Sequence, residues 1–344
     1  MRNVKQPHRG AGCLMFLDSA TRDECWIVKV HELPAWRTGA PAEEGAIPAS
    51  RITADEWNFH VGKGADLFET LTEAPVKLGD VAARIAQGIR TSANEVYVLD
   101  MVSETGDLVE AYSKQLDRTV VLERRSLKSF VQGREIKPYR VLASKKLLLM
   151  PYRIRGRQAS LISEDRMQRG YPRAWAYLCE SRSYLQDREK GRFRGPTWYM
   201  YGRQQNIDLM LLPKILVPDI ADRASFALDE SGQYAFTSGY GITLKPEVAA
   251  SPKYVLGLLN SKTLDFFLKK VSTTLRGGFF RYFTQYVQQL PIRRIDFSDA
   301  KDKAFHDRED PNALTQGYAQ GRLMVEFMMS EWGDQIIDQL LQAY

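Results

Sequence analysis

The residues that could perform acid–base, nucleophilic or metal chemistry are few and scattered along the sequence. The chain has four histidines, and no two of them have the spacing of metal ligands on a helix. It has neither a Walker-type phosphate loop nor a Gly-x-Ser-x-Gly turn. Glu135-Ile136-Lys137, with Asp117 upstream, has the E-x-K form with which metal-dependent nucleases hold a cation and polarise water. Because so short a pattern arises easily by chance, we expect no catalytic and no metal-ligating residue.

Positive charge is concentrated in the middle of the chain. The 344 residues carry a net charge of +6, but residues 118–203 hold 21 Lys and Arg against 7 Asp and Glu. That balance of +14 leaves −8 for the remaining residues. A basic region that spans several expected elements favours a polyanionic partner over a merely solvated surface, and we expect nucleic acid.

Two segments combine aromatic and basic residues at high density. The first is Trp198-Tyr199-Met200-Tyr201-Gly202-Arg203, which we interpret as too rich in aromatic residues to be entirely core. In the second, Thr274 to Tyr282, two glycines allow a close backbone approach and the flanking arginines supply charge. For this second segment a simple helix-to-helix loop, with Gly277 at the helix cap, remains an equal alternative.

Length and composition are those of an ordinary globular protein. Apolar residues make up 44% of the chain and charged residues 26%, and the length leaves room for about two domains. The three cysteines cannot all pair and have no metal-ligand spacing, which is typical of a reducing compartment. No stretch approaches the roughly 18 apolar residues that span a bilayer. We therefore expect a cytoplasmic protein without membrane association.

The elements that must position these residues follow an α+β pattern, with mixed order and no regular βαβ alternation. Apolar and β-branched runs predict strands at 95–100, 119–123, 147–152 and 214–218. A hairpin around Ser231-Gly232 is expected to join residues 226–228 to 234–236. Helical periodicity predicts helices at 172–188, 254–271 and 314–341.

Several segments, taken in chain order, resemble the TaqI-like C-terminal specificity region of adenine-specific DNA methyltransferases, including the fused type IIG restriction-modification enzymes. The segments that carry the resemblance are Gln87–Val98, Gly133–Tyr139, Tyr171–Arg188, Trp198–Arg203, Lys214–Ile220, Leu258–Ser261, Gly277–Tyr282 and Leu290–Ile292. Each is weak alone, but the ordered set is specific. One departure is Ser92, which stands where the family has a glycine after Thr91.

The resemblance implies a mixed β-sheet target-recognition domain with flanking helices over residues 75–297. Residues 1–74 would be the remnant of, or a connector after, a methyltransferase domain, and residues 298–344 a C-terminal helical segment. In the family, a Rossmann-like catalytic domain binds S-adenosylmethionine and takes up a flipped adenine while the specificity region grips duplex DNA. The catalytic Asn/Asp-Pro-Pro-Tyr motif and a Gly-rich cofactor loop are absent here. We therefore expect the cofactor on a separate methyltransferase domain or subunit, and only DNA recognition from this chain.

The residues that we expect to contact DNA fall into three groups. Phosphate contacts are assigned to Arg153, Arg155, Arg203 and Arg276. Base-edge or groove contacts are assigned to loops that hold Arg90, Thr91, Asn94, Lys137, Tyr139, Arg281 and Tyr282. The same surface is expected to include Trp198, Tyr199, Gly277 and Gly278.

Three alternatives stay open at this point. One is a metal-dependent DNA nuclease subunit that uses Glu135 and Lys137. Another is a single-strand- or RNA-binding protein that stacks bases on exposed aromatic side chains. The third is a structural subunit that binds no nucleic acid at physiological salt.

Overall fold

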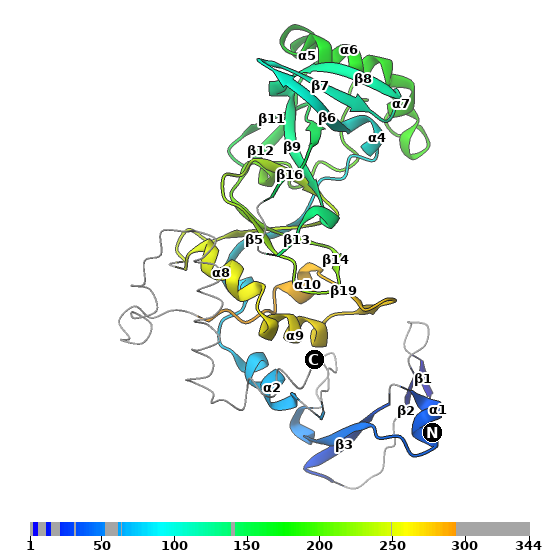
Figure 1. Ribbon diagram of the computed structural model, residues 1–344, viewed down its shortest axis with the longest axis vertical. Coiled ribbons are helices and arrows are strands. Elements are labelled where there is room, and N and C mark those ends of the chain that lie inside the picture. Colours follow the sequence, from blue (N-terminus) through cyan, green and yellow to red (C-terminus); the bar gives the residue numbers. More distant parts are fainter. Residues whose placement is uncertain are drawn as a thin grey trace. The chain divides into compact units, whose positions relative to one another are not determined.

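The computed structural model describes residues 3–5, 12–14, 21–30, 32–51, 61–62, 64–138, 142–248 and 250–293 (Figure 1). The chain divides into two compact units between Leu67 and Phe68, and each unit is treated by itself. Among the described helices, none combines the length and the apolar character needed to cross a membrane. The helix expected at 314–341 lies outside the described residues.

The first unit is built from two small antiparallel sheets. One pairs β1 (Asn3–Lys5) with β2 (Gly12–Leu14). The other pairs β3 (Glu24–Lys29) with β4 (Glu43–Pro48). Helix α1 (Leu33–Arg37) lies between β3 and β4 in the chain, and a short 3-10 turn, η1 (Ala49–Arg51), follows β4.

The second unit contains a six-stranded sheet in the order β16-β9-β10-β6-β7-β8. All its neighbours are antiparallel except β16, which runs parallel to β9. A separate hairpin, β11-β12, follows β10 in the chain. The bounds are β6 (Val98–Thr105), β7 (Leu108–Ser113), β8 (Arg118–Glu123), β9 (Leu127–Gln132), β10 (Lys146–Leu149), β11 (Tyr152–Arg155), β12 (Gln158–Leu161) and β16 (Tyr234–Thr237).

Two further sheets complete the second unit. A four-stranded antiparallel sheet has the order β15-β13-β17-β5, and a three-stranded one has the order β14-β19-β18. The bounds are β5 (Ala82–Gln87), β13 (Lys214–Pro218), β14 (Ile220–Ala221), β15 (Ala227–Asp229), β17 (Gly239–Leu244), β18 (Thr274–Leu275) and β19 (Phe279–Arg281). Mixed sheets with interspersed helices confirm the expected α+β class.

The helices of the second unit are short. They are α2 (Ala65–Glu73), which begins before the division, α3 (Leu78–Val81), α4 (Asn94–Tyr97), α5 (Glu164–Gly170), α6 (Pro172–Glu180), α7 (Arg182–Gly191), α8 (Pro252–Leu259), α9 (Lys262–Val271) and α10 (Thr284–Val287). Three 3-10 turns accompany them, η2 (Arg124–Ser126), η3 (Gly133–Glu135) and η4 (Asp208–Leu211). Of the expected strands, 119–123 and 214–218 are confirmed as β8 and β13, while the strand expected from residue 95 begins only at Val98, after α4.

Each of the two long helices predicted within the described residues is broken in two. Helix 172–188 is interrupted at Ser181, and helix 254–271 is interrupted at Asn260. The Asn260 amide pairs with the backbone N–H and C=O of Phe226, at 2.9 Å each, so a tertiary contact ends α8. The Ser261 hydroxyl then accepts the Leu264 N–H at 3.2 Å and begins α9.

The hairpin expected between residues 226 and 236 is wrong, although both strands form. β15 pairs with β13 in the four-stranded sheet, whereas β16 pairs with β9 in the six-stranded sheet. The Asp229 carboxylate accepts the backbone N–H groups of Gln233 and Tyr234, both at 3.0 Å. These bonds fix a turn that leads the chain out of one sheet and into the other.

A buried ion pair lies at the start of that turn. Lys214 and Asp229 stand opposite each other in the β13–β15 ladder, 2.6 Å apart, with side chains 0% and 1% exposed. The Lys214 ammonium also donates to the carbonyls of Met210 and Leu212, both at 3.1 Å. Burial lowers the pKa of Lys214, and the neighbouring Asp229 carboxylate opposes that shift.

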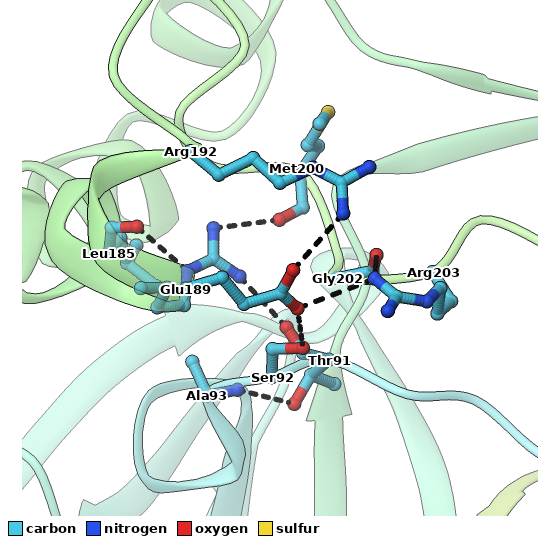
Figure 2. A network of polar contacts seen from close by, with 10 residues as sticks. Thr91, Ser92, Ala93, Leu185, Glu189, Arg192, Met200, Gly202 and Arg203 are labelled. Carbon is cyan, nitrogen blue, oxygen red and sulfur yellow. Dashed lines mark hydrogen bonds and ion pairs between the residues drawn. The ribbon is translucent and has the colours of Figure 1, made fainter.

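One buried arginine joins three segments of the second unit. The guanidinium of Arg188, which is 7% exposed, donates to the Leu185 carbonyl at 2.7 Å and to the Thr91 carbonyl at 2.8 Å. It also donates to the carbonyls of Trp198 at 2.8 Å and Met200 at 2.9 Å. The carbonyls of Thr91, Leu185 and Met200 are seen in Figure 2. Through these hydrogen bonds the Arg188 guanidinium connects the loop after β5, helix α7 and segment 198–203.

We expect Asp229→Asn to lower the free energy of unfolding by about 3–5 kcal/mol, because it leaves the Lys214 charge buried without its partner. Glu180→Gln is the matched control, since it breaks the ion pair with Arg118 whose two side chains are about half exposed. That control should cost less than about 1 kcal/mol. Urea unfolding of the two variants measures the difference, and equal losses would contradict a dominant role for the buried pair.

We expect Arg188→Lys to lower the free energy of unfolding by roughly 2–4 kcal/mol, because an ammonium cannot reach four separate carbonyls in the fork geometry of a guanidinium. Arg194→Lys is the control, because Arg194 is exposed and pairs only with Asp187 among the described residues. Thermal unfolding followed by circular dichroism compares the variants. A midpoint for Arg188→Lys as high as that of the control would show that the carbonyls find other donors.

Candidate nucleic-acid interface

Two arginines far apart in the sequence are brought together by a backbone bridge. The Gly202 N–H donates to the Thr91 carbonyl at 2.9 Å, and the Arg203 N–H donates to the Arg90 carbonyl at 3.0 Å. Arg90 and Arg203 are thus direct partners in an isolated antiparallel bridge, and both are exposed. Partners in such a bridge project to the same face, so their guanidinium groups share one surface.

The loop that carries Arg90 is held by its own side chains. The Thr91 hydroxyl donates to the Asn94 side-chain oxygen at 2.7 Å and accepts the Ala93 N–H at 3.0 Å. Thr91 is 2% exposed and so shapes the loop, whereas Asn94 is exposed. Ser92 has a φ of 56°, the left-handed region that a glycine enters most easily. The sequence departure at this position therefore leaves a backbone conformation that a glycine would favour.

A carboxylate that the sequence did not single out lies between this loop and segment 198–203. Glu189 accepts the Ser92 hydroxyl at 3.0 Å and pairs with Arg203 at 3.4 Å and Arg192 at 3.2 Å (Figure 2). The Ser92 hydroxyl, with Arg203 and Arg192 beside it, holds the pKa of the Glu189 carboxyl below its ordinary value. Glu189 adopts a φ of 46°, which turns the chain back at the end of α7.

A second group gathers around Tyr240, at the start of β17. Its ring contacts Phe283 edge-on, with centroids 6.2 Å apart, and the Arg281 guanidinium lies 4.9 Å from the Phe283 centroid. Burial raises the pKa of the Tyr240 hydroxyl and nearby Asp219 raises it further, while Arg90 and Arg281 lower it. Phe283 therefore lies in contact with both the Tyr240 ring and the Arg281 guanidinium.

The segment from Thr274 to Tyr282 is a hairpin, so the expected alternative of a helix-to-helix loop is wrong. Helix α9 ends at Val271, and β18 pairs with β19 on either side of a turn. Gly277 and Gly278 form that turn with φ values of 81° and 77°. Both glycines and Arg276 are exposed at the tip, and Phe279 beside them is 42% exposed. The exposed Phe279 was not among the expected contact residues.

The remaining expected cations differ in how they are compensated. Arg153 and Arg155 project from β11 as exposed residues that alternate with Tyr152 and Ile154. Within the described ranges, no side-chain ion pair or hydrogen bond engages Arg153, Arg155, Arg276 or the exposed Lys137. Arg203, by contrast, is paired with Glu189. Tyr139 lies outside the described residues.

The expectation of exposed aromatic side chains at 198–201 is wrong. Trp198, Tyr199 and Tyr201 are at most 2% exposed, and Tyr282 is fully buried. Trp175 of α6 supplies the packing surface, with ring centroids 5.5 Å from Trp198 and 5.2 Å from Tyr199. We therefore assign Trp198, Tyr199 and Tyr282 to the core that supports the loops, and nothing in the structure favours a base-stacking platform there.

The E-x-K triplet has a local structural role. The Glu135 carboxylate accepts the Gln132 N–H at 2.8 Å and the Ser144 hydroxyl at 3.3 Å, and so caps the turn η3. In the part of the chain that the structure describes, no three His, Cys, Asp or Glu side chains are grouped closely enough to hold a metal ion. Nothing in the structure or in the relatives below supports the nuclease alternative.

Comparisons with known proteins point to one class of relative. The chain is 26% identical over 317 residues to the Escherichia coli protein "Type II restriction enzyme and methyltransferase RM.Eco57I", which covers 86% of this chain and 31% of the relative. It is 26% identical to "Type II methyltransferase M.BanIII" of Aneurinibacillus aneurinilyticus, over 60% of this chain and 33% of the relative. It is 25% identical to "Type II methyltransferase M.XhoI" of Xanthomonas vasicola, over 70% of this chain and 39% of the relative. The chain thus spans about a third of the length of these relatives.

A scan against protein families confirms the resemblance seen in the sequence motifs. Residues 128–292 match the family described as the TaqI-like C-terminal specificity domain. The match runs from the second residue of β9 to beyond β19 and includes Arg153 on β11, Arg203 and Arg281 on β19, whereas Arg90 and its loop precede it. Residues 128–292 of this chain are thus similar to the TaqI-like C-terminal specificity domain.

Proposed function

We propose that this chain is the sequence-specific duplex DNA recognition part of an adenine-specific, S-adenosylmethionine-dependent DNA methyltransferase in a restriction-modification system. The observation that carries the proposal is the backbone bridge that sets the exposed Arg90 and Arg203 side by side, in a chain whose residues 128–292 match a specificity-domain family. Arginine forks onto guanine edges and phosphates, and two such groups at one place suit the reading of a groove.

The chemistry of methyl transfer would reside outside this chain. The matched region covers only 31%, 33% and 39% of three curated relatives described as methyltransferases, which supports a catalytic domain or subunit as partner. That partner would bind S-adenosylmethionine and the flipped adenine, while the present chain holds the distorted duplex. We place the assembly in the cytoplasm, as the cysteine usage suggests.

The exposed residues divide the work of DNA binding in two. Arg153, Arg155 and Arg276, which lack ion-pair partners among the described residues, would contact phosphates and supply salt-dependent affinity. A second group would face base edges or the groove: Arg90, Asn94 and Lys137 are exposed, and the half-buried Arg281 lies on β19 beside Phe283. Gly277 and Gly278 would let the hairpin tip approach the duplex closely.

Selection of bound duplexes from a randomised DNA pool, at roughly physiological salt, tests the proposed function. Recovery of one short motif that contains adenine is the expected result. Stronger binding to single strands or RNA than to duplex would favour the stacking alternative, and the absence of any binding would leave a structural subunit. Magnesium-dependent cleavage abolished by Glu135→Ala would instead support the nuclease.

We expect the double variant Arg153→Ala/Arg155→Ala to weaken binding to the same degree for every duplex sequence. The plot of log K against log salt should become shallower by about 2, because about 0.9 of slope is lost for each phosphate contact. Arg194→Ala is the control, since Asp187 already compensates that charge. Fluorescence anisotropy across a salt series measures the slopes, and a change in the preferred motif would contradict a phosphate role.

We expect Arg281→Ala to relax the preferred sequence at one or two positions, with a loss of about 1–3 kcal/mol of discrimination for a base that it reads in bidentate fashion. Arg281→Lys keeps the charge beside Phe283 but not the fork, so it should preserve affinity and lose most of the discrimination. Repeating the selection with both variants measures the effect. A uniform loss of affinity with an unchanged motif would reassign Arg281 to a phosphate.

A further inference from the structure

We propose that Glu189 is a specificity-determining residue that withholds the charges of Arg203 and Arg192 from DNA of the wrong sequence. The inference rests on the proposed function and adds a residue that neither the motifs nor the expected contact set contained. Arg203 shares its face with Arg90, at the bridge between the two loops. Its cation is nevertheless paired with Glu189, whereas Arg153, Arg155 and Arg276 form no ion pair with any side chain that the structure describes.

The position of the Glu189 carboxylate is fixed by three groups from separate parts of the chain. The Ser92 hydroxyl, in the loop after β5, donates to Oε1 of Glu189, and the Arg203 guanidinium, at the end of segment 198–203, contacts the same oxygen. Arg192, which follows α7, pairs with Oε2 (Figure 2). The exposed pairs Arg169–Asp165 and Arg194–Asp187 have one cation for each carboxylate. With three partners, the entropy cost of fixing the carboxylate is offset by several contacts, whereas an isolated surface pair has only one contact to offset it.

The backbone around the carboxylate is built for this contact. The residue before Glu189 is the buried Arg188, whose guanidinium holds both Thr91 and Met200. A Cβ on Gly202 would lie 1.9 Å from the Ser92 hydroxyl oxygen, so only glycine lets segment 198–203 approach Ser92 this closely. Ser92 and Glu189 both occupy the left-handed region, with φ values of 56° and 46°. Two residues, Ser92 and Glu189, are thus held in unfavourable backbone conformations, and these are the residues whose hydroxyl and carboxylate form the hydrogen bond.

A fixed carboxylate between two arginines has a different effect on random and on cognate DNA. A phosphate that takes Arg203 must displace Glu189 and approach a negative charge. On a random duplex, only the attraction between phosphate and guanidinium offsets the cost of displacing Glu189. Such a duplex is therefore contacted through the arginines that have no described ion-pair partner, Arg153, Arg155 and Arg276. On a cognate duplex, base contacts near Arg90 hold a phosphate in place and offset the cost. Glu189 therefore reduces non-specific affinity more than specific affinity, which is one way to gain specificity.

The test uses the full 344-residue chain, a random-sequence duplex and a duplex with the selected motif, each titrated by anisotropy across a KCl series. We expect Glu189→Gln to raise affinity for the random duplex by roughly three- to tenfold and to steepen its salt slope by about one to two, since one or two phosphate contacts are gained. Affinity for the motif duplex should rise less, so the ratio of the two affinities falls.

Two variants separate this role from a general effect of charge or folding. Asp187→Asn removes the same charge nearby and releases Arg194, and it should raise both affinities by one common factor. Ser92→Gly removes the hydroxyl that orients Glu189, keeps the charge and suits the left-handed backbone, so it should lower the affinity ratio in the direction of Glu189→Gln.

The inference is overturned if Glu189→Gln changes both affinities by the same factor, as Asp187→Asn does, or if Ser92→Gly leaves the affinity ratio unchanged. It also requires Arg203, so Glu189→Gln/Arg203→Gln should return the salt slope for random DNA toward the wild-type value. A wild-type chain that selects no motif and binds no duplex would instead reject the proposed function itself. The two failures are therefore distinguished by the wild-type protein alone.

Discussion

The guanidinium of Arg188 is the contact on which the candidate interface depends. It gathers four backbone carbonyls from three segments into the interior, and each of these segments ends in a residue that faces outward. Thr91 is followed by Ser92, Leu185 lies on α7 four residues before Glu189, and Met200 leads to Arg203 (Figure 2). A buried cation satisfied by carbonyls is costly to disturb, so it fixes loop positions that exposed ion pairs alone would not hold.

The surface around this anchor separates two kinds of positive charge. Arginines on β11 and at the β18–β19 turn have no partner among the described side chains, which suits them to any phosphate backbone. Arg203 and Arg192 share a carboxylate, and Arg281 lies over an aromatic ring. Charges that are held in a defined direction favour discrimination between sequences, whereas uncompensated charges favour affinity.

The sequence predicted what is local and missed what is tertiary. Strand β13 was predictable because it is a short apolar run, all of it buried with Lys214 included. The family motifs located the loop of Arg90 and the hairpin that carries Arg281. The break at Asn260 was not predictable, because it depends on a contact with Phe226. The burial of Trp198 and Tyr199 depends on packing against Trp175, and the position of the Glu189 carboxylate depends on the Ser92 hydroxyl. No local sequence pattern indicates either contact.

The turn that Asp229 organises has a consequence for the mechanics of the second unit. It connects β15 and β16, which belong to different sheets, through only the residues between 229 and 234. So short a tether, fixed at its base by a buried ion pair, limits how far one sheet can move away from the other. The amides of β9 and β13 should therefore exchange with solvent deuterium at similar rates, as one cooperative block, although they lie in separate sheets.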